Sequence, residues 1–146
     1  MTQATLEDHV LDIDQTLEIK AAPAEVYEGL LRRLCHIEGV DGRPDVILKL
    51  ERRPGGRYYR DLGNDAGHLW GIVQSIKPPF LIEFFGPMMM SHPVAGHLIV
   101  RLAEIPGGTK LDFRHRAFGM VPPELKEGLP LGWGQVLQSL KRDVER

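Results

Sequence analysis

The N-terminal part of the chain carries two hydrophobic patterns in succession. Side chains at the odd positions from Leu11 to Ile19 are mostly apolar and those between them are charged or polar, which predicts a half-buried strand over residues 10–20. Pro23 then suits the first turn of a helix, because that position needs no amide hydrogen. Apolar residues recur on one helical face as far as Cys35, so the sequence predicts a short helix after the strand; these residues are Val26, Leu30, Leu31 and Leu34.

The central part of the chain has the pattern of an antiparallel sheet. Turn-forming residues separate six predicted strands, which are Val46–Leu50, Arg57–Leu62, His68–Ile76, Phe80–Phe85, His97–Ile105 and Lys110–Ala117. Because Gly86–Gly96 holds two prolines, we expect a long loop there. In the last run Leu111, Phe113 and His115 share one face and charged residues occupy the other, which predicts a sheet covered on one side only.

A helical period returns after Pro123. Apolar residues at 129, 133, 137 and 140 fall on one face, which predicts an amphipathic helix over residues 128–144. A curved antiparallel sheet packed against such a helix buries the apolar faces of both. The predicted fold class is therefore α+β: a curved antiparallel sheet wrapped around a long C-terminal helix, with a short helical segment near the N-terminus.

Composition narrows the class of protein. The 146 residues are 42% hydrophobic and 26% charged, so we expect one globular domain over residues 1–146, with residues 1–9 as a loosely ordered extension. A net charge of −2 provides no basic excess for phosphates, and nucleic acid is not an expected partner. Cys35 is the single cysteine, which excludes an internal disulfide. The chain has no apolar stretch of the ~20 residues that span a bilayer, and its polar start lacks the features of a signal peptide, so we expect a cytoplasmic protein without a membrane span.

Several short motifs occur in a recognisable order. They are Ala22-Pro23-Ala24-Glu25-Val26-Tyr27, Pro54-Gly55-Gly56, Gly71-Ile72-Val73 before Lys77-Pro78-Pro79, Gly107-Gly108-Thr109-Lys110-Leu111, and Gly132-Trp133 before Leu137-Gln138-Ser139-Leu140-Lys141. With this order and spacing the chain resembles the START-like, or SRPBCC, superfamily and, within it, the activator of heat-shock protein (Hsp) ATPase homologue group. The resemblance implies the helix-grip fold. The resemblance leaves the function open, because the superfamily includes lipid-transfer proteins, cyclases, hormone receptors and chaperone activators.

Aromatic residues give the best signal for a site. A curved sheet against one helix often leaves an apolar pocket, and the residues expected to line it are Tyr58, Trp70, Phe84, Met89, Phe113, His115 and Trp133. The alternative for each aromatic ring is a place in the packed core. His115 either orients a ligand by a hydrogen bond or is a partly buried histidine that is hydrogen-bonded to the backbone. The run Met88–Met90 forms a cavity lid, a partner-binding patch or a loop packed against its own domain.

These observations identify no catalytic residues and favour a binding function. We expect a protein that binds a small, mostly apolar molecule between the sheet and the C-terminal helix. Two alternatives stay open: a module that contacts a chaperone, and a cyclase- or hydrolase-like enzyme that uses the same cavity. No nucleophile and base can be paired from the sequence, and no two histidines have the i, i+4 spacing of a helical metal site, so we expect no metal or other cofactor.

Overall fold

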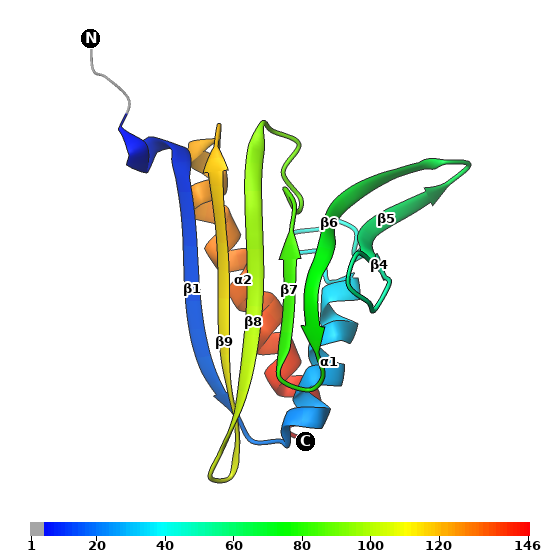
Figure 1. The fold of residues 1–146 in the computed structure, drawn as a ribbon, viewed down its shortest axis with the longest axis vertical. Helices are drawn as coiled ribbons and strands as arrows, with labels where there is room; N and C mark the ends of the chain where they lie inside the picture. The colour runs from blue at the N-terminus through cyan, green and yellow to red at the C-terminus, as the bar shows by residue number, and fades with distance from the viewer. Residues whose placement is uncertain (1–4) are drawn as a thin grey trace.

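The computed structural model describes residues 5–146, which form a long antiparallel sheet with two α-helices on one face (Figure 1). In chain order the elements are η1 (Leu6–His9), β1 (Val10–Ile19), α1 (Pro23–Cys35), β2 (His36–Ile37), β3 (Val46–Ile47), β4 (Lys49–Leu50), β5 (Arg57–Gly63), β6 (Ala66–Lys77), β7 (Leu81–Phe85), β8 (Val94–Ile105), β9 (Gly108–Gly119) and α2 (Pro123–Val144). Seven strands make one sheet in the order β1-β9-β8-β7-β6-β5-β4, and β2 pairs with β3 separately. The predicted α+β class and the helix-grip arrangement are confirmed.

The helices lie together on one side of the sheet. Figure 1 shows α2 running behind β1, β9 and β8, with α1 beside it behind β6 and β7. The Arg33 guanidinium on α1 joins the two helices, since its Nε and Nη2 donate to the Asp143 carboxylate of α2 at 2.6 and 2.8 Å. The apolar faces of both helices are buried against the sheet, so one continuous core fills the space between the layers.

Strands β1 and β9 show why the sheet is covered on one side. Ile13 pairs with His115 across the two strands, and both side chains are buried under α2. On the opposite face the Arg114 guanidinium donates to the Asp12 carboxylate at 2.9 and 3.1 Å. The predicted alternation of apolar inner and charged outer positions is confirmed in these strands.

The segment predicted as one strand, Val46–Leu50, is divided between two sheets. β3 pairs with β2, whereas β4 pairs with β5 at the edge of the large sheet. Leu48 lies between them with its side chain buried, and its amide donates to the Cys35 carbonyl at 2.8 Å. The prediction of a single strand was wrong because this bond turns the chain toward the end of α1.

Two predicted boundaries also shift. The expected loop Gly86–Gly96 ends at residue 93, because Val94 pairs with Gly119 and β8 starts there. Pro93 therefore precedes the strand and removes no hydrogen bond from it. The C-terminal helix begins at Pro123 instead of residue 128, with proline in its first turn.

The first half of α2 has a composition that is poor for a helix. Three glycines and Pro130 fall within residues 128–134, and proline there removes one helical hydrogen bond. Gln15 of β1 supports this half, since its Nε2 donates to the Pro130 carbonyl at 2.8 Å. A β-carbon at Gly128 or Gly132 would meet no atom within 4 Å, so packing does not require glycine at either position.

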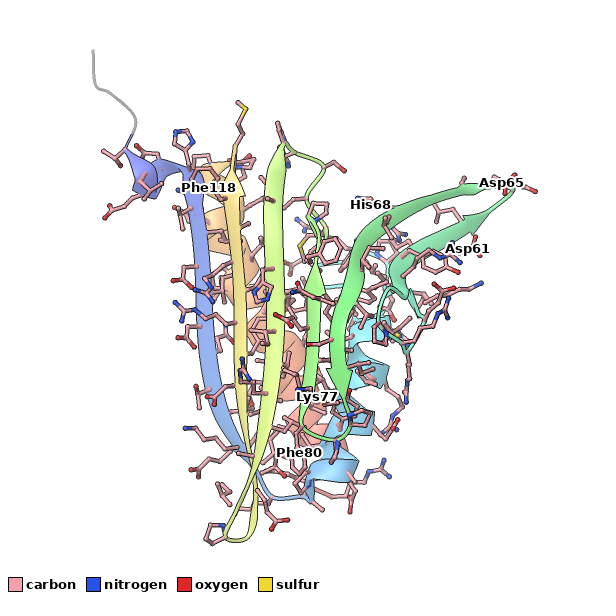
Figure 2. All side chains as sticks on the ribbon, in the orientation of Figure 1. Asp61, Asp65, His68, Lys77, Phe80 and Phe118 are labelled. Carbon is pink, nitrogen blue, oxygen red and sulfur yellow. The ribbon has the colours of Figure 1, made fainter. Side chains whose placement is uncertain are left out.

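The hairpin of β5 and β6 extends away from the body of the molecule. Figure 2 shows Asp61, Asp65 and His68 on this arm, with Asp65 at its tip. The arm exposes two large apolar side chains, Leu62 at 62% and Leu69 at 48%. Within residues 5–146 the strands of its outer part pair only with each other, because β4 pairs no further than Lys49 with Tyr59; the Lys49 ammonium still donates to the Asp61 carboxylate at 2.9 Å.

At the N-terminus, residues 1–4 of the expected extension lie outside the described residues. Leu6–His9 form the 3-10 turn η1, which Thr5 and Asp8 close by a reciprocal capping interaction. Within residues 5–146 neither α-helix is long and apolar enough to cross a membrane.

Candidate functional site

A cavity of about 430 Å³ lies between α2 and the segment that joins α1 to the large sheet. Trp70 of β6 and Met89 of the β7–β8 loop close it from the other sides. Its apolar lining residues are Ile37, Val40, Pro44, Val46, Trp70, Met89, Leu129, Trp133 and Val136, and its polar ones are Arg33, His36, Glu38, Arg43, Gln135 and Ser139, with Gly39 and Gly132 between them. The volume is in the range of small-molecule sites, and the largely apolar wall favours an apolar occupant.

Trp133 of α2 is fixed in the cavity wall by the strand behind it. Its indole Nε1 donates to Nδ1 of His115 on β9 at 3.0 Å, and the two rings meet edge to face. Phe113, two residues along β9, contacts the same indole at a centroid distance of 5.0 Å. A ring held by both a hydrogen bond and packing presents a defined surface to the cavity.

His115 is buried and neutral. Its side chain has 0% exposure, and burial, with a smaller contribution from His97, lowers its pKa to about 4. Because an indole nitrogen only donates, Nδ1 of His115 must be the acceptor and the ring proton sits on Nε2. That Nε2 is buried and makes no hydrogen bond within the described residues. The histidine therefore positions Trp133 and has no lone pair left for a ligand.

The methionine run divides between core and cavity. Met88 and Met90 are buried in the core, whereas Met89 is half-buried and lines the cavity. Met88 has a φ of 56°, an uncommon value for a residue with a side chain, and its amide donates to the Trp70 carbonyl at 2.8 Å. The alternative of a loop packed against its own domain describes Met88 and Met90; only Met89 is placed to cover a ligand.

The segment from β2 to β3 forms the outer wall, and Asp45 holds it. One carboxylate oxygen accepts from the Gly39 amide at 2.9 Å, and the other lies 2.7 Å from Nε2 of His36. These two contacts lower the pKa of Asp45 below its ordinary value. Asp41 and Gly42 form a left-handed turn, with φ values of 54° and 78°, which brings Arg43 back toward the cavity. The wall is therefore a compact, internally bonded loop.

Only some of the residues predicted to line a pocket also line the cavity in the structure. Trp70, Met89 and Trp133 come together around the cavity. Tyr58, Phe84 and Phe113 have 0% exposure and lie in the packed core, where the Tyr58 ring meets Trp70 edge to face and Phe84 at a tilt. His115 lies behind Trp133 and is not in the cavity wall. The core alternative therefore describes the positions of these four residues.

The sequence analysis missed the wall between Ile37 and Val46. Gly39, Gly42 and Pro44 are typical of a break between elements, and no periodicity marks the segment. The apolar residues among these breaks were the one available signal. Within residues 5–146 no group of three or more His, Cys, Asp or Glu side chains is placed to hold a metal ion.

A curved sheet that closes around a C-terminal helix, with an apolar cavity at that helix, defines a START-like protein. The family described as Activator of Hsp90 ATPase homolog 1-like protein matches residues 20–145, and the chain belongs to that family. The resemblance drawn from the motifs is thereby confirmed. No curated protein sequence matches the chain.

Solved structures share the fold at low identity. Protein CV1439 from Chromobacterium violaceum is 23% identical, with a TM-score of 0.71 over 92% of this chain and 97% of that one. The Aha1 dimer from Colwellia psychrerythraea is 17% identical, with a TM-score of 0.67 over 92% of this chain and 96% of that one. The di-domain ARO/CYC StfQ from the steffimycin biosynthetic pathway is 16% identical, with a TM-score of 0.65 over 96% of this chain and 52% of that one. These similarities show the fold alone.

Proposed function

We propose that this protein binds a small, mostly apolar molecule in the cavity between α2 and the β2–β3 wall. The observation that carries the proposal is the apolar lining of a preformed space of about 430 Å³. The apolar side chains that line this open cavity face solvent, and an apolar ligand that covers them removes their surface from water. Burial of the ligand contributes roughly 25 cal/mol per Å² of apolar area, before the cost of immobilising it.

The proposed contact residues differ in their roles. Trp70, Met89 and Trp133 contact the ligand directly, together with Leu129 and Val136 of the wall. His115 acts through Trp133 as a positioning residue. Phe113 supports Trp133 from the core.

The first test is a titration with the neutral fluorescent probe N-phenyl-1-naphthylamine. We expect saturable binding, and we expect Met89→Lys to weaken it at least about tenfold, because a charge placed in the apolar wall must be desolvated. Met120→Lys is the matched control, since Met120 is exposed and outside the cavity lining. Absence of saturable binding, or equal loss in both variants, would refute the proposed site.

Contact with a chaperone is the second candidate function. It is supported by the description of the family and by the projecting β5–β6 arm, on which Leu62 and Leu69 are exposed (Figure 2). The test is the ATPase rate of purified Hsp90 with and without this protein. The double variant Leu62→Ser, Leu69→Ser should abolish any stimulation, whereas Leu131→Ser, at an exposed position on α2, should keep it. An unchanged ATPase rate with the parent protein would exclude this candidate.

A further inference from the structure

The charges around the cavity are not equally compensated. Arg33 is held by two carboxylates, Asp143 at 2.6 Å and Glu38 at 2.5 Å, which keep its pKa above the ordinary value. Glu38 is thus occupied by Arg33, and Asp45, which holds the wall, is occupied by His36 and the Gly39 amide. The Glu38 carboxylate in the lining and the Asp45 carboxylate in the wall therefore both have partners within the protein.

Arg43 is the exception among the charged lining residues. It lines the cavity, yet its guanidinium makes no ion pair or side-chain hydrogen bond with any residue that the structure describes. The turn through Asp41 and Gly42 fixes its backbone, because the Arg43 amide donates to the Val40 carbonyl at 3.1 Å. Arg43 is therefore an exposed cation at the rim of a largely apolar cavity, and no side chain among the described residues neutralises it.

We propose that the natural ligand is an amphipathic anion whose apolar body fills the cavity and whose single anionic group, such as a carboxylate, binds Arg43. This inference rests on the proposed function and adds the chemical class of the ligand. A guanidinium matches a carboxylate or sulfonate with paired hydrogen bonds. A cavity of about 430 Å³ lies in the range of small-molecule sites, and dodecanoate is a simple member of the proposed ligand class.

Two probes with the same aromatic ring system distinguish the contribution of an anionic group to binding from that of the apolar body. N-phenyl-1-naphthylamine is neutral, and 8-anilinonaphthalene-1-sulfonate carries one negative charge on the same ring system. We expect Arg43→Gln to weaken the sulfonate probe roughly fivefold and to leave the neutral probe unchanged, since an exposed ion pair contributes modestly. Arg43→Lys should restore part of the loss, and Arg101→Gln, an exposed arginine on β8 outside the cavity lining, should change neither probe.

A second measurement uses unlabelled ligands. Dodecanoate should displace the neutral probe at lower concentration than 1-dodecanol does, and salt should remove this difference by screening the exposed pair. Equal effects of Arg43→Gln on both probes, or equal displacement by acid and alcohol, would overturn the anionic class while leaving the cavity as a binding site. Failure of both probes to bind would instead refute the proposed function itself. Because Arg43 is exposed, unchanged melting of Arg43→Gln confirms that the comparison is made on folded protein.

Discussion

Trp133 on α2 donates a hydrogen bond to Nδ1 of His115 on β9 at 3.0 Å, and this bond joins the cavity wall to the centre of the sheet. Both side chains are buried, so water cannot replace either partner when the other is removed. The bond also fixes the tautomer of the histidine, which places its proton on an Nε2 without a partner. The orientation of the Trp133 indole in the cavity wall therefore depends on this buried imidazole.

His115→Ala should lower the free energy of unfolding by roughly 2–5 kcal/mol, because it opens a cavity and leaves the Trp133 indole without an acceptor. Urea denaturation measures the loss. In a ¹⁵N NMR spectrum only one of the two indole resonances should move strongly, since Trp70 does not bond to this histidine. His97→Ala is the control on the outer face of β8; if it costs as much as His115→Ala, the role given to the buried bond is wrong.

Stability should fall as the pH drops below the ordinary histidine pKa of 6.5. The folded-state pKa of His115 is about 4, so between pH 6.5 and pH 4 the unfolded chain binds a proton that the folded chain does not. Loss of stability from this group reaches about 2 kcal/mol at pH 5 and is absent above pH 7. Denaturation curves of the parent and of His115→Phe at several pH values isolate this effect, and parallel curves for the two proteins would contradict it.

Two glycines of α2, Gly128 and Gly132, provide a matched pair for testing whether the helix lines the binding site. Gly132 lines the cavity and Gly128 does not, although neither would place a β-carbon within 4 Å of another atom. Either glycine to alanine should stabilise the helix by up to about 1 kcal/mol. With leucine, only Gly132→Leu should weaken binding of N-phenyl-1-naphthylamine, by roughly tenfold, because its side chain occupies the cavity. Equal affinities of Gly132→Leu and Gly128→Leu would place the probe elsewhere.

The three methionines should separate into two classes. Met88→Ser and Met90→Ser should each reduce stability by roughly 2–5 kcal/mol, because both side chains are buried in the core. Met89→Ser should change the melting temperature little and weaken probe binding, since Met89 is half-buried at the cavity. Thermal melting and probe titration of the three single variants make the comparison. A stability loss at Met89 as large as at Met88 would show that the whole run is structural.

The sequence predicted the parts of the fold that depend on local periodicity. The alternation from Leu11 to Ile19 marked β1, and the helical spacing through Trp133 and Leu140 marked α2. In both cases one face is buried and the other is solvated, so the pattern of apolar and polar side chains predicts the type of element and its buried face. Proline positions were less informative about boundaries, because Pro93 is the last residue of the loop and β8 starts directly after it.

The site was harder to predict because it depends on contacts between distant segments. Tyr58 and Trp70 are both aromatic residues on inner strand faces, yet only Trp70 lines the cavity. The partnership of Trp133 with His115 requires the position of α2 over β9, which no local pattern gives. The β2–β3 wall has too few regular residues to show a period at all.

The most direct test of the binding account uses the two tryptophans, both of which line the cavity. The ¹⁵N-labelled protein is titrated with N-phenyl-1-naphthylamine, and the two indole resonances are followed. If the cavity is the binding site, the resonances of Trp70 and Trp133 shift together and saturate with one dissociation constant. If neither resonance shifts, or if saturable shifts appear only at residues outside the cavity, the account is contradicted.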